Sequence, residues 1–165
     1  MRRFWFVLVL ALGVSAAQGE VKVLTPQEAS EIVKRATAEV LVQMSLLDLK
    51  PIAEALREVR VQRGVKVYLL TTTEGLTHRA SYAPSLALAG VVVRYAPRVE
   101  GEFLVIDRRM GLVLKRDYIG HTLEEARPEP LVERFYYAFL RATPFAVEEW
   151  VHRLYVQEYL RRSRR

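Results

Sequence analysis

Hydrophobic and polar residues follow one another along the chain in blocks that predict strands and helices in alternation. Short apolar runs at residues 21–24, 40–44 and 65–70 are typical of strands, and the third is apolar enough to be buried on both faces. Between these runs, apolar residues recur at spacings of three and four, which predicts helices opening at Pro26 and near Pro51. This order is that of parallel βαβ units, so we predict an α/β fold.

The second half of the chain continues the pattern with shorter elements. After a polar loop at residues 71–82, we predict a short helix at 84–89, followed by strands at 91–95, 102–107 and 112–114. Two helices close the chain, at 131–141 and 145–160. Each carries an apolar stripe at helical spacing, which we expect to face the core: Leu131, Phe135 and Phe139 in the first helix, and Val147, Trp150, Val151 and Leu154 in the second.

The first 19 residues have the pattern of a Sec-type signal peptide. Two arginines precede the apolar run from Phe4 to Val14, and small residues follow it. That run is shorter than the roughly 20 apolar residues that span a bilayer. We therefore predict an exported protein, periplasmic or secreted, with an uncleaved anchor or a buried helix as the alternative.

The charge of the chain is concentrated at its two ends. The formal net charge is +6, from 25 Lys and Arg against 19 Asp and Glu. Six arginines lie in the terminal segments, and without them cations and anions are equal in number: Arg2, Arg3, Arg161, Arg162, Arg164 and Arg165. The tail at residues 161–165 can be a solvated helix end that complements the helix dipole, or a segment that binds an anionic polymer or surface.

Few residues carry recognisable chemistry. Cysteine is absent, which excludes disulfides, thiolate metal sites and a cysteine nucleophile. His78, His121 and His152 lie far apart without metal-ligand spacing, so we expect surface or structural roles for them. Ser45 and Thr71 to Thr73 lack an activating pattern, although the threonines follow a strand end, where α/β sheets bind ligands. We expect no cofactor.

Several segments taken together resemble the phospholipase D superfamily, in particular its small exported single-motif nucleases. The similar segments are, in order, Val21-Lys22-Val23-Leu24-Thr25-Pro26, Val40-Leu41-Val42-Gln43-Met44-Ser45, Ile52-Ala53-Glu54-Ala55-Leu56, Arg63-Gly64-Val65-Lys66-Val67 and Leu86-Ala87-Leu88-Ala89-Gly90-Val91-Val92-Val93. The resemblance extends from Val21 to Asp107. It implies a phospholipase D-like sheet with flanking helices, here followed by the two C-terminal helices, and pairing of two copies across the site.

The catalytic motif of that family departs from its pattern in this chain. The family uses H-x-K-x4-D, in which His attacks a phosphodiester, Lys holds the phosphate oxygens and Asp supports the site. Counting back from Asp107 puts Glu100 at the His position and Glu102 at the Lys position. Residues two apart on a strand share a face, and two carboxylates about 5.5 Å apart repel by roughly 3 kcal/mol. A phosphate would be repelled by both.

These residues leave three interpretations open for the site. Glu100, Glu102 and Asp107 can form an exposed strand face, or they can bind a divalent cation if they converge. If the protein is instead a phosphodiesterase or nuclease with a non-standard site, Lys115, Arg94 or His121 are possible replacements for the missing groups.

We therefore predict an exported phospholipase D-like domain at residues 20–160, between the signal peptide and the basic tail. We expect it to have lost phosphodiesterase activity and to act as a binding or structural module. We expect a homodimer, with a heterodimer with an active relative as an alternative. A further possibility is nucleic-acid binding through the tail.

Overall fold

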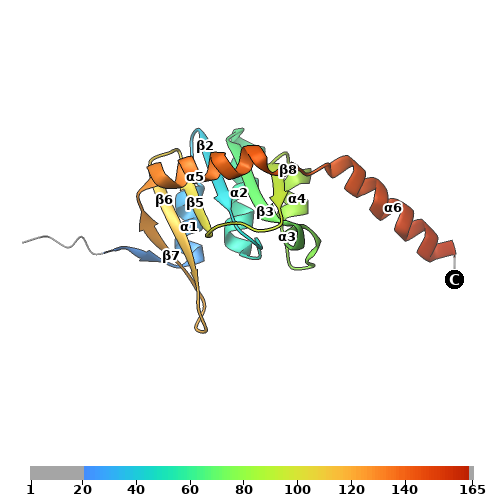
Figure 1. Cartoon of the computed structure of the whole chain (residues 1–165), viewed down its shortest axis with the longest axis horizontal. Coiled ribbons are helices and arrows are strands. Elements are labelled where there is room, and N and C mark those ends of the chain that lie inside the picture. The colour runs from blue at the N-terminus through green and yellow to red at the C-terminus, as the bar shows by residue number, and fades with distance from the viewer. Residues whose placement is uncertain (1–20, 164–165) are drawn as a thin grey trace, which may run out of the picture.

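The computed structural model describes residues 21–163, whose strands form one eight-stranded sheet (Figure 1). The strand order is β1-β7-β6-β5-β2-β3-β4-β8. Its parallel part consists of β2 (Glu39–Gln43), β3 (Lys66–Thr72) and β4 (Val92–Ala96). These are the strands predicted from the apolar runs, and the α/β fold is confirmed. All three have their carboxyl ends at the same edge of the sheet.

The other half of the sheet is antiparallel. It contains β5 (Phe103–Ile106), β6 (Met110–Arg116), β7 (His121–Ala126) and the edge strand β1 (Val23–Leu24). The opposite edge is β8 (Thr143–Pro144), which pairs with β4. β7 was not predicted, because only one of its residues, Leu123, is a buried apolar side chain.

The first two helices begin at or next to the predicted prolines, Pro26 and Pro51. Helix α1 (Pro26–Val33) opens with a capping box between Thr25 and Glu28, and α2 (Lys50–Arg63) ends at Gly64, whose φ of 66° suits glycine. Helix α4 (Ala83–Leu88) matches the predicted short helix. The segment predicted as a polar loop contains a further short helix, α3 (Thr73–Thr77), capped by the hydroxyl of Thr72.

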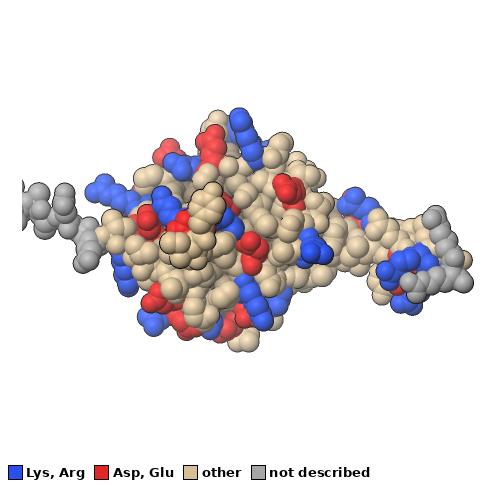
Figure 2. Space-filling view, turned by 90° about the horizontal axis from the view of Figure 1, so that it is seen from below, with Lys and Arg blue, Asp and Glu red and all other residues tan. Residues whose placement is uncertain are grey.

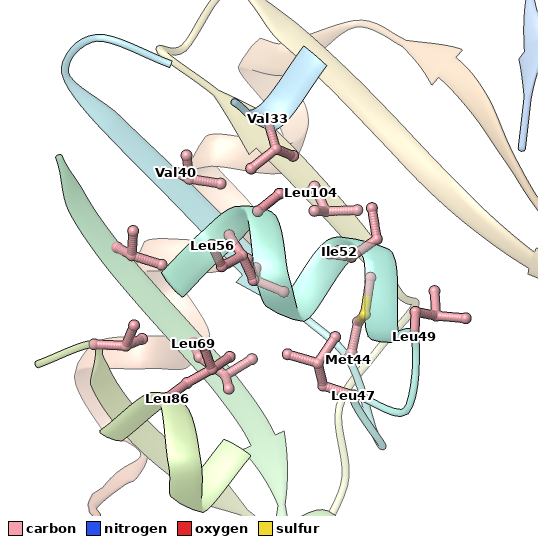
Figure 3. Packing of buried hydrophobic residues seen from close by; sticks show 14 of the residues in the cluster. Val33, Val40, Met44, Leu47, Leu49, Ile52, Leu56, Leu69, Leu86 and Leu104 are labelled. Atoms are coloured by element: carbon pink, nitrogen blue, oxygen red, sulfur yellow. The ribbon is translucent and has the colours of Figure 1, made fainter. Parts of the chain in front are cut away.

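Helices cover both faces of the sheet. Helices α1, α2 and α4 pack on one face, where Ile52 and Leu56 of α2 meet side chains of the central strands (Figure 3). Helix α5 (Pro128–Arg141) covers the other face. Its stripe of Leu131, Phe135 and Phe139 is buried, as the spacing predicted. The two faces thus have separate apolar clusters.

The last helix departs from the prediction. Helix α6 (Val147–Ser163) projects away from the sheet instead of packing along it (Figure 1). Val147 packs against the core and Trp150 contacts the ring of Phe145, but Leu154 is 45% exposed. The predicted core-facing stripe is therefore wrong at Leu154, which lines an open pocket between α6 and α3 instead of packing into the core. No helix within residues 21–163 has the length and apolar character needed to cross a membrane.

Candidate functional site

A cluster of polar side chains gathers around Arg116, beside the carboxyl end of β2. Arg116 is the last residue of β6, and His121 is the first of β7. Ser45 and Asp48 lie in the connection from β2 to α2, and Glu102 immediately precedes β5. Sheet pairing therefore brings the β6–β7 hairpin residues Arg116 and His121 together with Glu102 and with the connection after β2.

The guanidinium of Arg116 is the centre of this cluster. Its Nε donates to Glu102 Oε2 over 2.8 Å, and its Nη1 donates to Asp48 Oδ1 over 3.0 Å. Its Nη2 donates to the carbonyl of Leu46 over 2.7 Å, and Nη1 lies 2.8 Å from His121 Nε2. The Arg116 side chain is 28% exposed and that of Glu102 is 18% exposed, so solvent screens this pair less than a surface ion pair.

Glu102 is bound on both of its oxygens. Its Oε1 accepts hydrogen bonds from the backbone N–H of Ser45 over 2.9 Å and from the Ser45 hydroxyl over 2.6 Å. Burial opposes ionisation of Glu102, but the hydrogen bonds from Arg116 and Ser45 outweigh it and hold its pKa below the ordinary value. Burial also disfavours the charged form of Arg116, but the hydrogen bonds to Glu102 and Asp48 outweigh it and raise the pKa of Arg116. Both groups are therefore charged.

The carbonyl of Ser45 joins this cluster to the end of β3. The hydroxyls of Thr71 and Thr72 donate to it over 3.0 and 2.8 Å. Gly75 of α3 lies so close that a Cβ there would be 2.2 Å from both the Ser45 oxygen and the Thr71 hydroxyl oxygen. The threonines thus have a structural role in holding the connection after β2.

The structure corrects the predicted placement of Glu100. Glu100 lies in the turn before β5 and is exposed, and Gly101, with a φ of 77°, separates it from Glu102. The two glutamates therefore do not lie side by side on one strand face. The backbone carbonyls of Glu100 and Gly101 accept hydrogen bonds from the Gln43 amide, which fixes the turn to the end of β2.

Asp107 lies at the opposite end of β5 from Glu102. Its carboxylate accepts hydrogen bonds from the backbone N–H groups of Thr37, Ala38 and Glu39 and from the Thr37 hydroxyl. Burial opposes its ionisation, but these bonds together keep the pKa of Asp107 below its ordinary value. The structure therefore does not bring the three motif carboxylates together. Among residues 21–163, no three His, Cys, Asp or Glu side chains are grouped to hold a metal ion.

The three proposed replacement groups have different positions. His121 lies in the cluster, against Arg116. Lys115 is 3.9 Å from Glu124, and Arg94 donates to the carbonyl of Phe139 and stacks on the Phe139 ring at 5.0 Å. Of the three, only His121 is therefore close to Glu102. Neither Arg116 nor Asp48 was predicted as a site residue, because neither belongs to a spaced motif.

The remaining sequence candidates lie outside the cluster. His78 accepts a hydrogen bond from the backbone N–H of Ala80 in the loop after α3, and His152 is exposed on α6. Arg161 and Arg162 both pair with Glu158 at the far end of α6, where Figure 2 shows cations gathered. Over the body in the same view, cations and anions are interspersed. Arg164, Arg165 and the predicted signal peptide lie outside the described residues.

The charged and hydroxyl groups of the cluster are already paired with one another. The Ser45 hydroxyl donates its hydrogen bond to Glu102, and both oxygens of Glu102 already accept hydrogen bonds. One cation faces two carboxylates, Glu102 and Asp48, so the cluster has no surplus positive charge with which to hold a phosphate.

Comparison with solved structures shows that the fold is phospholipase D-like. Nuc of Salmonella typhimurium, a phospholipase D family member, has a TM-score of 0.61 at 17% identity, covering 76% of this chain and 97% of that one. NucT of Helicobacter pylori has the same TM-score at 15% identity, covering 76% of this chain and 98% of that one. At these identities the likeness shows the fold alone.

A second kind of relative has the same fold. TrmBL2, an archaeal chromatin protein described as binding DNA in a novel mode, has a TM-score of 0.55 at 18% identity. The match covers 80% of this chain and 57% of TrmBL2, so the chain corresponds to little more than half of that protein. No curated protein matches the sequence. The family model "Transcriptional regulator TrmB, EBD N-terminal subdomain" matches residues 14–133, well over half of the chain, and the chain therefore belongs to that family.

Proposed function

We propose that the chain is a binding module built on the phospholipase D fold and without phosphodiesterase activity. The observation that supports this most directly is the state of Glu102. Counting back from Asp107 in the sequence assigns this residue to the lysine position of the phospholipase D motif. Glu102 is an ionised carboxylate whose two oxygens are bound by Arg116 and Ser45. A phosphate placed there would compete with Glu102 for Arg116, the cation that already neutralises it.

The test is an assay of the purified chain on bis(4-nitrophenyl) phosphate and on plasmid DNA, each with magnesium and with EDTA. We expect no turnover above buffer in any condition. Metal-dependent turnover that Glu102→Gln or His121→Ala abolishes would contradict the proposal and favour a phosphodiesterase with a non-standard site. His152→Ala is the matched control, because His152 is exposed on α6.

We further propose that the module is a homodimer paired through α6. This helix exposes large apolar side chains along its length, including Tyr155 at 76%, Leu154 at 45% and Leu160 at 48%. Glu148 and Glu149 lie in its first turn, and Arg161 and Arg162 in its last. Antiparallel packing of two copies centred on Tyr155 would set the acidic end of each helix against the basic end of the other and cover the two Tyr155 side chains.

Sedimentation equilibrium of charge-reversal variants tests this pairing. Glu148→Arg with Glu149→Arg should weaken the dimer, and Arg161→Glu with Arg162→Glu should do the same. The quadruple variant should restore it, because the opposite charges again face one another across the pair. A wild-type chain that stays monomeric at high micromolar concentration, or a quadruple variant that is not restored, would reject antiparallel pairing.

A second candidate function is association with DNA. Its support is the family match to a transcriptional regulator, the likeness to TrmBL2, and the basic tail at residues 161–165. Electrophoretic mobility shift with a random 30-base-pair duplex tests it. Binding through the tail should fall steeply between 50 and 200 mM salt and disappear when residues 161–165 are removed. Binding that persists without the tail would locate the DNA surface elsewhere.

Export remains part of the proposal and rests on the sequence of residues 1–19. Fusion of residues 1–25 to a phosphatase that is active only outside the cytoplasm tests it. The matched control is the same fusion with Val9→Arg, which places a charge in the apolar run. Reporter activity with cleavage near residue 19 is expected. An inactive, uncleaved fusion would contradict export and favour the DNA-associated role.

A further inference from the structure

A small cavity lies at the carboxyl end of the parallel strands, on the face of the sheet that α5 covers. Gln43 of β2, Leu70 of β3 and the turn containing Arg98 and Glu100 line it, and Arg134 of α5 lines its other side. Its volume is about 190 Å³. Pockets for drug-sized ligands measure about 300–1,000 Å³, so this cavity suits a smaller molecule. The carboxyl edge of parallel strands is where α/β sheets bind ligands.

A buried hydrogen-bond acceptor at this cavity has no partner in residues 21–163. Gln43 is 1% exposed, and its Nε2 donates to the carbonyls of Glu100 and Gly101 over 2.7 and 3.1 Å. These two bonds to carbonyls fix which end of the amide is nitrogen. The other end, Oε1, is buried and accepts no hydrogen bond from the described residues. Buried polar groups are nearly always paired, so this oxygen is suited to a donor on a bound molecule.

The charged residues of the cavity have both signs. Arg98 and Arg134 supply two cations, and Glu100 supplies one anion. Arg134 lies directly beside the turn, because a Cβ added to Gly101 would be 3.6 Å from its Nη1. A molecule with one carboxylate and one positively charged donor therefore matches the lining: its carboxylate is complementary to the arginines and its donor to Glu100 and Gln43 Oε1.

The rest of the lining is apolar or aromatic. Leu70 is 1% exposed, and Ala96, Val99 and Ala138 add further apolar surface, with Tyr137 of α5 beside them. An apolar side chain of a few carbons would be buried there, while the charged groups of the same molecule meet the arginines and Glu100. A free α-amino acid with an aliphatic side chain combines these features at the size of the cavity.

We infer that this cavity binds a free aliphatic α-amino acid. The inference rests on the proposed binding role and names its ligand class, and it does not depend on the Arg116 cluster. Phosphodiester turnover in the assay above would contradict the proposed loss of phosphodiesterase activity. It would not contradict amino-acid binding, which the titration below tests separately.

Isothermal titration calorimetry of the full chain with L-leucine as the probe tests the inference. We expect saturable binding with one molecule per chain. 2-Hydroxy-4-methylpentanoate lacks the ammonium group and 3-methylbutylamine lacks the carboxylate, so each should bind at least tenfold more weakly. Arg98→Gln, Arg134→Gln and Glu100→Gln should each reduce leucine affinity about tenfold or more, since each removes a charged partner.

Arg127→Gln is the matched control, because Arg127 is exposed at the start of the same helix as Arg134 and does not line the cavity. It should bind leucine as the wild-type chain does. The exchanged side chains of Arg98, Glu100 and Arg134 are exposed, so the variants should keep the wild-type circular dichroism and melting temperature. Absence of leucine binding would overturn the inference and leave the cavity as a site for water. So would a double variant, Arg98→Gln with Arg134→Gln, that binds leucine as tightly as the wild-type chain.

Discussion

Arg116 Nε donates to Glu102 Oε2 across 2.8 Å, joining the end of β6 to the residue that precedes β5. The same guanidinium reaches Asp48 and the carbonyl of Leu46 in the connection to α2. This arrangement ties three segments together through one side chain. We therefore expect Arg116 to hold the β2–α2 connection in place and to stabilise the fold.

Removing Arg116 should destabilise the fold because it leaves a partly buried carboxylate without its cation. We expect Arg116→Met to lower the free energy of unfolding by about 1–3 kcal/mol in urea denaturation. The double variant Arg116→Met, Glu102→Gln should lose less than the sum of the two single variants, with a coupling energy of about 1 kcal/mol.

The exposed pair Lys50–Glu54, 3.6 Å apart on α2, is the control for that cycle. Its coupling energy should be about 0.5 kcal/mol or less, because solvent screens both groups. Strictly additive effects of Arg116→Met and Glu102→Gln would show that the pair contributes nothing to stability.

Asp107 should matter for stability and not for a chemical step. Asp107→Ala removes the acceptor of four hydrogen bonds from residues 37–39, so we expect a loss of about 2–3 kcal/mol in unfolding free energy. Asp117→Ala in the exposed β6–β7 turn should cost about 1 kcal/mol or less, although Asp117 also accepts two backbone hydrogen bonds. An equal cost at both positions would contradict the special role of Asp107.

Acid should destabilise the protein through Glu102 and Asp107. Both have a pKa in the folded chain below the ordinary value, so the unfolded chain binds their protons more readily. Their contribution is fully present above the unfolded-state pKa values of about 4 and is lost as pH falls through the folded values. Urea midpoints measured from pH 6 to pH 3 should therefore decline, and Glu102→Gln with Asp107→Asn should flatten that decline. An unchanged slope would exclude these two carboxylates as its source.

Gly75 tests the packing beneath the cluster. Gly75→Ala places a Cβ 2.2 Å from the Ser45 oxygen and from the Thr71 hydroxyl, so the connection after β2 must shift. We expect a loss of about 1–3 kcal/mol in thermal or urea unfolding. Gly64→Asn is the control, because no atom lies within 4 Å of a Cβ there and asparagine tolerates its positive φ. It should cost less than Gly75→Ala.

Strands β2 and β3 were predictable because burial on both faces makes most of their residues apolar. Val65 to Leu70 and the periodic faces of α1 and α2 are direct consequences of that burial. β7 was not predictable in this way, since most of its side chains are only partly buried. Helix α6 has apolar residues at helical spacing, as a buried helix does, and only the tertiary structure shows that it leaves the body.

The candidate site was predicted only in part. Counting from Asp107 identified Glu102, but spacing on a strand could not foresee that Gly101 turns the backbone and separates Glu100 from it. Arg116 reaches Glu102, 14 residues earlier in the chain, because β5 and β6 pair. Gln43 was not predicted either, since its interest lies in one buried oxygen, Oε1, that accepts no hydrogen bond from the described residues. Contacts of this kind form between residues far apart on the chain, so local sequence patterns cannot predict them.

The two edges of the sheet limit how copies of this protein can associate. Each edge strand described, β1 and β8, is only two residues long, and β8 ends in Pro144, which has no N–H to donate. Short or proline-containing edges give an incoming strand few hydrogen bonds to complete. Continuous growth of the sheet from chain to chain is therefore disfavoured, and concentrated samples should resist fibril formation, with association left to helical surfaces.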